Sequence, residues 1–326
     1  MANSPEQSGS VLNNECFRPS KINDPFRIDL IDGHRFIAID APGAHEIDDA
    51  IRIRRLRGGF LMQVAIADGT KLAEESNRHI VEKAINKREN RYCRDKVTRR
   101  ILPKAVSGQL SLQKGTNDAL VISQKFTDEG EKFGNTEIFP ALVNIKRTTY
   151  QAFGQDCVRK YQNEITNPYT DFYEIFRRTR NFRPKSIGNI IRERGIAGLS
   201  QRIVSASMIL ANISLAQWAQ TNSVPILFRE FSEDKEIDED DYTPIHANYS
   251  PNPELHCGIP GFNDGVVYTH ATSPLRRAAD LVNHLQVAHA LANNEAPFST
   301  EEMKAIIINL NKRPKKTKKT EEVAIN

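Results

Sequence analysis

Four carboxylates fall within ten residues of one another, and their spacing is suited to binding a cation. They are Asp40, Glu46, Asp48 and Asp49. The apolar run 36–39 predicts a β-strand that ends at Asp40, and Pro42-Gly43 predicts a turn that brings the later acids back towards it. A hard divalent cation such as Mg²⁺, which prefers oxygen ligands, would relieve the repulsion between them. The alternative is an exposed acidic turn without a ligand.

A second stretch, Tyr268–His284, carries residues expected at a phosphate-binding helix N-terminus. Ser273 is a favourable N-cap and Pro274 a favourable first helical residue, so the sequence predicts a helix over 274–292. The free amides of its first turn would face an anion, and Arg276 in the same turn has a planar guanidinium suited to phosphate oxygens. The alternative is a plain capped helix with a surface arginine.

Both stretches resemble motifs of the RNB-domain exoribonucleases, the ribonuclease II and ribonuclease R family. Ile39-Asp40 followed by Glu46–Ala50 is similar to the acidic motif of that family, and Thr272–Asp280 is similar to its Thr-Ser-Pro-Ile-Arg signature. Weaker matches lie between them, at Val64–Asp68, Ile101–Pro103, Ser111-Leu112 and Arg147–Tyr150. The resemblance covers about residues 26–310.

The resemblance implies an α+β fold, a single RNB-type catalytic domain with a mixed β-sheet packed against helices. It also implies an Mg²⁺-dependent exoribonuclease, with Mn²⁺ as the other candidate ion. Such an enzyme hydrolyses single-stranded RNA from its 3′ end and releases nucleoside 5′-monophosphates. The acidic stretch and the stretch Tyr268–His284 would then both act on the same RNA phosphodiester.

The resemblance also assigns roles to individual residues. It makes the four acids the metal ligands and catalytic residues, and Arg276 the catalytic residue that contacts the scissile phosphate. Tyr150 corresponds to a family tyrosine on which an RNA base stacks, and Phe182 to a second stacking aromatic. Ser273 and Arg277 complete the expected RNA-binding set.

Several positions depart from the family pattern and support a rival hypothesis. Glu46 stands where relatives usually have aspartate, Ala278 replaces an aromatic residue, and Ser205-Ala206 replaces a pair of glutamates that helps to select the sugar. The flanking oligonucleotide-binding barrels of the family have no room in this chain, so we expect a compact member. The rival is a catalytically weakened RNB fold kept for RNA binding or scaffolding.

The composition is that of an ordinary soluble globular protein, with 326 residues of which 39% are hydrophobic and 26% charged. No uninterrupted apolar run approaches the length needed to cross a bilayer, so we expect no membrane partner and a place in the cytoplasm or an organelle matrix. The four cysteines are scattered and include no Cys-x-x-Cys pair, which excludes the usual zinc pattern.

The net charge of +4 is unevenly distributed. Basic residues concentrate at Lys87–Lys104, at Arg177–Arg202 and at Lys312–Lys319. Clusters set among aromatics such as Tyr92 suit an RNA backbone with stacked bases, and solvated helix faces are the alternative.

The chain divides into a flexible N-terminal arm at 1–25, a catalytic domain at 26–310 and a basic tail at 311–326. We expect strands at 36–40, 51–53, 60–67, 119–126 and 138–145, and helices at 72–86 and 200–220, the second with an apolar core stripe. The acidic segment Ser232–Tyr242 is expected to be a solvated connection, with a metal site as the alternative.

Overall fold

A mixed β-sheet forms the centre of the protein. The computed structural model describes residues 19–93, 96–163, 166–179, 186–231, 247–259, 262 and 264–312. Within these ranges six strands pair in the order β1-β8-β2-β3-β4-β7. Their bounds are β1 Ile28–Leu30, β2 Phe36–Asp40, β3 Asp49–Leu56, β4 Gly59–Ala67, β7 Gly115–Thr127 and β8 Lys132–Thr149. Strand β8 also pairs with β7, so the sheet curves round into a barrel.

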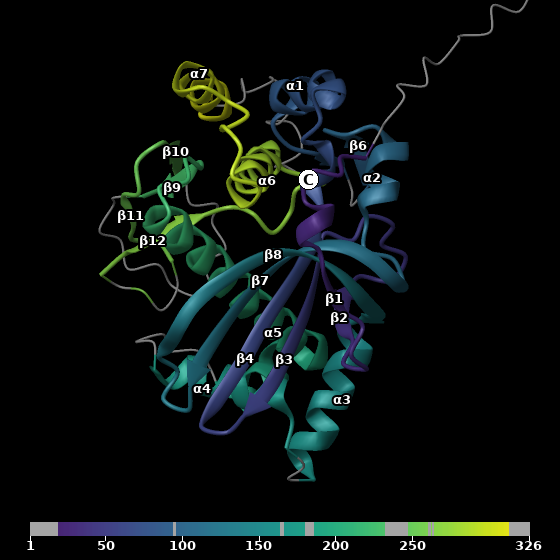
Figure 1. The fold of residues 1–326 in the computed structure, drawn as a ribbon. Coiled ribbons are helices and arrows are strands. Elements are labelled where there is room, and N and C mark those ends of the chain that lie inside the picture. The colour runs from purple at the N-terminus through teal and green to yellow at the C-terminus, as the bar shows by residue number, and fades with distance from the viewer. Residues whose placement is uncertain are drawn as a thin grey trace, which may run out of the picture.

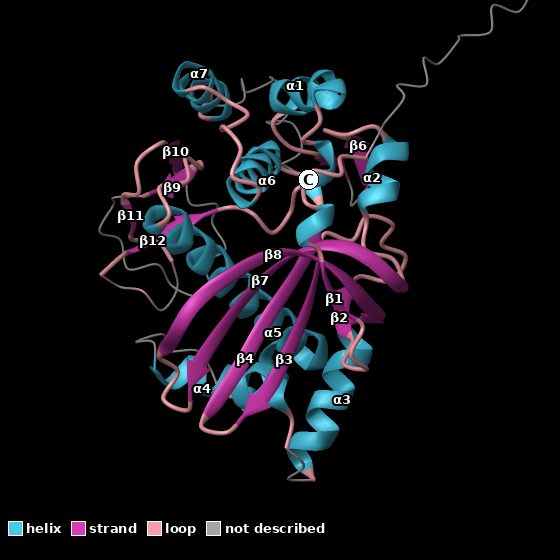
Figure 2. Cartoon of the chain, in the orientation of Figure 1, coloured by secondary structure: helices cyan, strands magenta, loops and turns pink. Residues whose placement is uncertain are grey.

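Helices and two small sheets surround this barrel (Figure 2). The helices are α1 Arg78–Lys87, α2 Lys104–Leu110, α3 Tyr150–Gln162, α4 Pro168–Thr179, α5 Ile187–Thr221, α6 Ala278–Leu291 and α7 Thr300–Leu310. Short 3-10 helices lie at Asp24–Phe26, Gly69–Leu72 and Glu75–Asn77. One small sheet contains β9 Phe228–Glu230, β10 Asn248–Ser250, β11 Leu255–His256 and β12 Val266–Thr269, and the other pairs β5 Arg91–Cys93 with β6 Lys96–Arg99. The predicted α+β fold with a mixed sheet is confirmed.

The alternation of side chains along the strands divides the interior into two cores. On β4, Phe60, Met62, Val64 and Ile66 pack in the core that contains α3, α4 and α5. The intervening Ala65 and Ala67 belong to the core beneath α1, α2 and α6. Figure 1 shows this second group of helices above the upper end of the sheet, with α5 behind the strands. The last residue of β2 and the first residue of β3 therefore lie at the same end of the sheet.

By length and composition alone, helix α5 is long and apolar enough to cross a bilayer. We expected no apolar run of that length. However, 56% of the apolar stretch that meets this criterion is buried inside the protein, where it faces α3, α4 and the sheet. Gly195 interrupts the helix with a φ of 71°, near its first third. The predicted apolar stripe is thus part of the core, as expected, although the helix begins earlier than residue 200.

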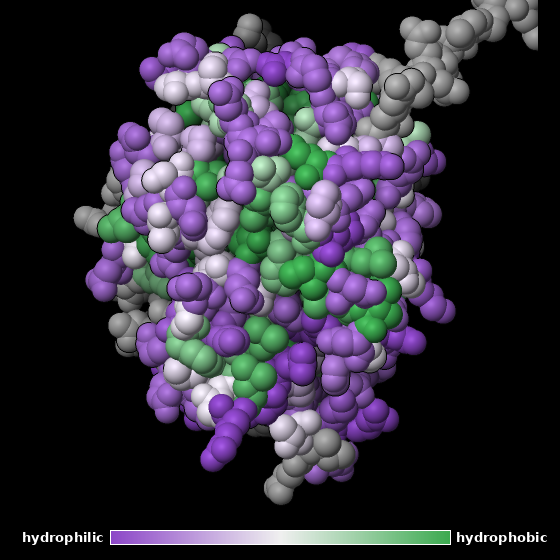
Figure 3. All heavy atoms as spheres, in the orientation of Figure 1, coloured by the Kyte–Doolittle hydropathy of each residue, from purple (hydrophilic) through white to green (hydrophobic). Residues whose placement is uncertain are grey.

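The outer surface is mainly polar. In the space-filling view of the same face, apolar side chains show in the middle of the molecule and polar ones dominate its rim (Figure 3). Residues 20–25, predicted as part of a flexible arm, instead contact the body of the protein. Ser20 donates its N–H to the carbonyl of Lys71, and Lys71 pairs with Asp24 at 2.9 Å. The rest of the arm, residues 1–18, lies outside the described residues, as does the tail from 313 and the acidic segment 232–242.

Helices α3 and α5 approach so closely at Gly154 that a larger residue has no space. A Cβ there would lie 2.4 Å from the carbonyl oxygen of Ile196 and 2.8 Å from Oγ of Ser200. We predict that Gly154→Ala lowers the free energy of unfolding by about 1–3 kcal/mol, because backbone must move to relieve the overlap. The matched control is Gly108→Ala at an exposed position of α2, where a Cβ meets nothing within 4 Å.

The control should raise the free energy of unfolding by about 0.5–1 kcal/mol, since alanine restricts the unfolded chain and favours helix. Urea denaturation of both variants measures the difference. Equal stability of the two variants would show that α3 can move away from α5 without cost.

Candidate active site at the ends of β2, β3 and β8

The strand order brings three predicted site residues to one end of the barrel. Asp40 is the last residue of β2 and pairs in register with Thr149, the last residue of the parallel strand β8. Tyr150 follows directly as the first residue of α3, and Asp49 is the first residue of the antiparallel strand β3. Because β3 starts where β2 ends, all of them lie at the same end of the barrel.

The loop between β2 and β3 is fixed from two sides. Ser111 Oγ accepts the N–H of Ile47 at 2.8 Å, and the carbonyl of Ile47 accepts the N–H of Leu112 at 3.0 Å. Arg147, on β8, donates to the carbonyl of Ala44 at 2.6 Å. Ser111-Leu112 and Arg147 belong to the weaker matches in the sequence, and their contacts show that they hold the acidic loop in place.

The three aspartates share one poorly solvated environment. Burial, together with the negative charges of Asp48 and Asp40, raises the pKa of Asp49 to about 7. Burial also raises the pKa of Asp48 to about 6, against the opposing charge of Arg276. The pKa of Asp40 is raised by burial too, and the charges of Arg147 and Arg276 oppose that rise. The structure therefore brings together three of the four predicted acids and the predicted arginine.

Asp48 is held by the second motif. Its Oδ1 accepts the backbone N–H of Leu275 at 2.9 Å, and its Oδ2 pairs with Nε of Arg276 at 3.1 Å. The amide that we expected to face a phosphate thus binds a carboxylate of the protein itself. The guanidinium of Arg276 keeps its outer nitrogens accessible, because 47% of the side chain is exposed.

The predicted N-cap at Ser273 is wrong. Residues 273–277 form an isolated turn, closed by the N–H of Arg277 and the carbonyl of Ser273 at 3.0 Å, and α6 begins only at Ala278. The cause is Asp280, a buried carboxylate that accepts the N–H of Ser273 and pairs with Arg277, both at 2.8 Å. Ser273 is buried and the guanidinium of Arg277 is paired with Asp280, and RNA binding by these two residues stays a prediction. Both build the turn that presents Leu275 and Arg276.

Glu46, the fourth acid, has partners of its own. Its carboxylate accepts Oγ of Ser107 at 2.6 Å and pairs with Arg100 at 3.2 Å. Sequence reasoning counted Arg100 only within a basic cluster and did not consider Ser107. No local signal links either residue to Glu46, since both lie more than 50 positions further along the chain.

Tyr150 lies beside the acids, as predicted. Burial, together with the charges of Asp40 and Asp49, raises the pKa of its hydroxyl to about 12. Ser200 on α5 donates its hydroxyl to the carbonyl of Tyr150 at 2.6 Å, which fixes the start of α3. Phe182, the second predicted stacking residue, lies outside the described residues.

The donor chemistry at this end of the sheet fits a hard divalent cation, and two of the acids are unengaged. Within the described ranges, the carboxylates of Asp40 and Asp49 have no hydrogen bond or ion pair, while Asp48 and Glu46 have both. Among the residues that the structure describes, no three acidic, histidine or cysteine side chains lie together as a ready-made metal site. Asp40 and Asp49 are thus the two acids that would not have to give up a partner to bind a cation.

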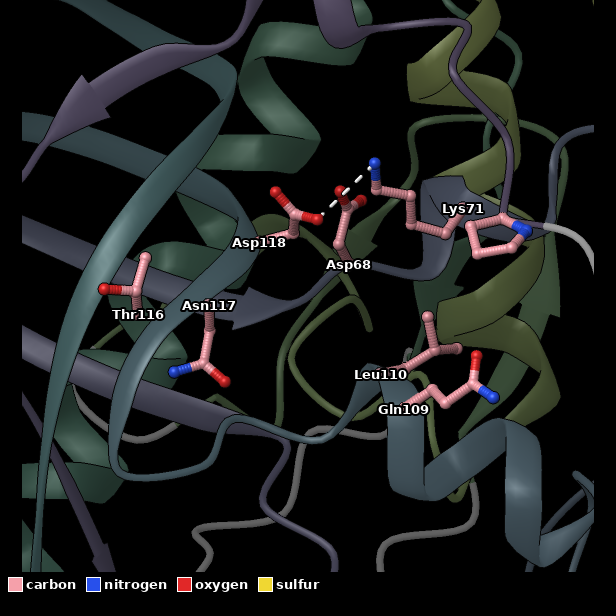
Figure 4. Close-up of a pocket in the computed structure, with 8 residues that line it drawn as sticks. Asp68, Lys71, Gln109, Leu110, Thr116, Asn117 and Asp118 are labelled. Atoms are coloured by element: carbon pink, nitrogen blue, oxygen red, sulfur yellow. Dashed lines mark ion pairs between the residues drawn. The ribbon is translucent and has the colours of Figure 1, made fainter.

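A polar pocket of about 250 Å³ lies elsewhere, between α2, β7 and the segment that follows β4 (Figure 4). Asp68, Lys71, Asn117 and Asp118 are among its lining residues. Its charges are already compensated, because Lys71 pairs with Asp118 at 3.5 Å and Arg27 pairs with Asp68 at 3.1 Å. None of the predicted site residues lines this pocket.

Comparison with known proteins gives consistent matches. The family model described as RNB domain matches residues 27–245 and 243–293. The chain is 24% identical to an uncharacterized ribonuclease, sll1290, of Synechocystis sp., over 93% of this chain and 49% of that protein. It is 21% identical to ribonuclease R of Mycoplasma genitalium, over 83% of this chain and 46% of that protein. The chain thus spans about half the length of these two relatives.

Solved structures share the fold. Ribonuclease R of Mycoplasma genitalium in complex with ribose-methylated single-stranded RNA has a TM-score of 0.65 and 19% identity, over 88% of this chain and 55% of that one. The Dss1 exoribonuclease of Candida glabrata, an active-site mutant, has a TM-score of 0.65 and 19% identity, over 87% and 45%. Yeast Ssd1, described as a pseudonuclease, has a TM-score of 0.64 and 16% identity, over 90% and 44%.

The raised pKa of Asp49 predicts a pH-dependent stability in the absence of divalent ions. Because the folded state holds the Asp49 proton up to about pH 7 and the unfolded state releases it near 3.8, ionisation of Asp49 lowers the free energy of unfolding as the pH rises through that window. We predict that Asp49→Asn becomes progressively more stable than the wild type between about pH 4 and pH 7, with a constant difference above.

Urea denaturation in EDTA at several pH values measures this difference. Asp128→Asn, at the opposite end of the sheet in the β7–β8 turn, is the matched control and should not reproduce the rise. A difference between Asp49→Asn and wild type that stays the same from pH 4 to pH 8 would contradict the shared, poorly solvated environment.

Proposed function

The chain belongs to the RNB domain family, and from this premise we propose that it is an Mg²⁺-dependent exoribonuclease that hydrolyses single-stranded RNA from the 3′ end to nucleoside 5′-monophosphates. The ribonucleases among its relatives support the general class. The observation that carries the proposal is the meeting of Asp40, Asp48 and Asp49 with Arg276 and Tyr150 at one end of the barrel.

The acids are assigned to the metal. Mg²⁺ or Mn²⁺, held by Asp40, Asp48 and Asp49 with Glu46 as the fourth acid, would supply an activated water and stabilise the leaving 3′-oxygen. The chain itself provides the negative charge that makes this place attractive to a dication, since three aspartates are packed into a poorly solvated space. Glu46 would act from a position fixed by Ser107 and Arg100.

Arg276 and Tyr150 are assigned to the RNA. The Nε of Arg276 is paired with Asp48, which leaves the two outer nitrogens of the guanidinium to donate to phosphate oxygens. These donors would stabilise the negative charge that develops on the phosphate oxygens during hydrolysis. Tyr150 would stack on a base of the terminal nucleotides, because its ring lies next to Asp40 and Asp49 and is only half-buried. Together these two residues would place the last phosphodiester over the acids.

Single-stranded RNA is the proposed substrate. The resemblance of both motifs to the exoribonucleases supports hydrolysis from the 3′ end. Ribonuclease R of Mycoplasma genitalium has been solved with ribose-methylated single-stranded RNA and also with double-stranded RNA. On the basis of the first complex, we propose that this chain also binds single-stranded RNA.

A second candidate function rests on the contacts of the acids. Asp48 and Glu46 hold internal partners, and the described residues include no ready-made three-ligand metal group. Such a site suits an RNB fold that binds RNA or serves as a scaffold without efficient hydrolysis. The fold similarity to Ssd1, a pseudonuclease, is compatible with that function.

The two candidates make opposite predictions for cleavage. With 5′-labelled single-stranded RNA and Mg²⁺, the exoribonuclease should produce a ladder that shortens progressively from the 3′ end, and EDTA should stop it. Asp49→Asn removes a negative charge from the metal site, so single-turnover cleavage should fall by orders of magnitude while RNA affinity in EDTA persists or improves. Asp128→Asn, far from the site, is the control and should cleave as the wild type does.

Arg276→Ala should behave differently from Asp49→Asn in one respect. It should lower single-turnover cleavage by about 100-fold, because its contact strengthens as charge develops on the phosphate, with a modest loss of RNA affinity. Intact RNA after prolonged incubation of the wild type with Mg²⁺ or Mn²⁺ would favour the second candidate. Fragments of random internal length would indicate an endonuclease instead.

A further inference from the structure

The chain makes a strained turn at Arg88, directly after α1. The backbone there has φ of 70° and ψ of −60°, and the N–H of Glu89 donates to the carbonyl of Lys87 at 2.9 Å. These angles and this hydrogen bond define a γ-turn of the rare type, which is strained in a residue that has a side chain. Such a conformation persists only where the surrounding structure holds it.

Arg88 differs from the other non-glycine residues that have a positive φ. Within the described part of the chain these are Ser223 and Asn293, each with φ of 53° and each just beyond a helix end, where a left-handed residue is common. Arg88 also follows a helix, but its ψ lies roughly 100° from that of the left-handed helical region. The end of α1 alone therefore does not require this turn.

Hydrogen bonds from three parts of the chain hold Arg88 in its turn. Its N–H donates to the carbonyl of Ala84 in α1 at 2.9 Å. Its carbonyl accepts the N–H of Ala278, the first residue of α6, at 2.7 Å. Its guanidinium donates to the carbonyl of Lys312, beyond the end of α7. The strained conformation is thus maintained where α1 meets α6 and α7.

The turn at Arg88 presents two main-chain groups to the segment 276–278. The carbonyl of Arg88 binds one end of this segment, at Ala278, and the N–H of Asn90 donates to the carbonyl of Arg276 at the other end, at 2.9 Å. Because a γ-turn redirects the chain within three residues, both groups face the same short segment. Strand β5 follows at once and forms with β6 the β5–β6 ribbon, which is anchored beside this segment.

Arg276 is constrained from its other side by an acid of the candidate site. Asp48 accepts the N–H of Leu275 at 2.9 Å and pairs with Nε of Arg276 at 3.1 Å. Asp48 orients the guanidinium, while Arg88 and Asn90 fix the main chain from which it extends. A group that acts on a reacting phosphate must be placed accurately, because a displacement of about 1 Å can lower the rate by a factor of about 100.

We propose that Arg88 is a positioning residue for Arg276, because its turn fixes the main chain from which the guanidinium of Arg276 reaches the RNA phosphate. This inference rests on the proposed function for the role of Arg276. The conformation of Arg88 carries the effect, and its own guanidinium only helps to maintain that conformation through Lys312. A residue that adopts the turn without strain should therefore replace Arg88, and a residue that cannot adopt the turn should not.

Two substitutions at one position separate the turn from the side chain. Arg88→Gly and Arg88→Val both remove the guanidinium, but glycine adopts a positive φ freely, whereas a β-branched residue is rarely found there. Single-turnover cleavage of 5′-labelled single-stranded RNA with Mg²⁺ is measured for each variant, alone and combined with Arg276→Ala. Hydrogen exchange of the amides of residues 275–278 is measured in EDTA, and thermal denaturation shows whether each variant folds.

Arg88→Gly should cleave within about threefold of the wild type, because the turn is kept. Arg88→Val should cleave about 10- to 100-fold more slowly, because Arg276 is no longer held in place. In the Arg276→Ala background Arg88→Val should cause no further loss, since it acts through Arg276. The amides of 275–278 should exchange faster in Arg88→Val than in Arg88→Gly.

Equal cleavage by the glycine and valine variants would overturn the inference. A loss in Arg88→Val that is equally large in the Arg276→Ala background would also overturn it, because the substitution would then act on the whole structure and not through Arg276. If Arg88→Val does not fold, Arg88→Ala takes its place, since alanine tolerates a positive φ better than valine but less well than glycine.

The outcome is separate from that of the proposed function. If the wild type cleaves RNA with Mg²⁺ and the valine variant cleaves like the glycine variant, the inference about Arg88 alone fails. If the wild type leaves RNA intact, the proposed hydrolysis fails and the exchange measurement decides the inference. Faster exchange of residues 275–278 in the valine variant alone would then support the positioning role, and equal exchange in both variants would overturn it.

Discussion

The repulsion among buried carboxylates is the constraint on which the rest of the structure depends. Asp40, Asp48 and Asp49 meet at the end of the barrel, where water is too scarce to screen them. The chain compensates Asp48 with groups from its other end, since the partners of Asp48 lie 227 and 228 residues further on. The same contacts attach the turn before α6 to the acidic loop. The contacts of Asp48 with Leu275 and Arg276 thus both compensate its charge and join the two halves of the chain.

Local signals predicted the strands, because alternation and turn residues act over a few positions. The strand 36–40 and the strand 60–67 follow from apolar runs bounded by Asp40 and by Gly58-Gly59, and they agree with β2 and β4. The two motifs also identified which acids and which arginine would meet. The start of α6 could not be predicted from Ser273-Pro274, because the N–H of Ser273 donates to the carboxylate of Asp280 and the helix begins only after the turn 273–277. A buried partner seven residues away outweighed a favourable cap.

The partners of the acids were beyond sequence reasoning for a related reason. No residue near Glu46 in the sequence indicates that its carboxylate will bind Ser107 and Arg100. Likewise, no residue near Arg276 indicates that its Nε will pair with Asp48. These pairings follow from how the barrel, α2 and the turn before α6 come together. They matter for function, since the two candidate functions differ in whether Asp48 and Glu46 can exchange these partners for a cation. The motifs alone do not distinguish them.

Main-chain hydrogen bonds join the residues before β5 to the turn that presents Arg276, from the N–H of Asn90 to the carbonyl of Arg276 and from the N–H of Ala278 to the carbonyl of Arg88, and this join has a consequence for how such a protein can evolve. Around Arg88 and Ala278 the donors and acceptors are main-chain groups, which are the same for every side chain except proline. Asn90 is the exception, since its side chain also binds Ile101. Natural variation can therefore alter the charge or the aromatic ring of the ribbon while its anchorage stays intact.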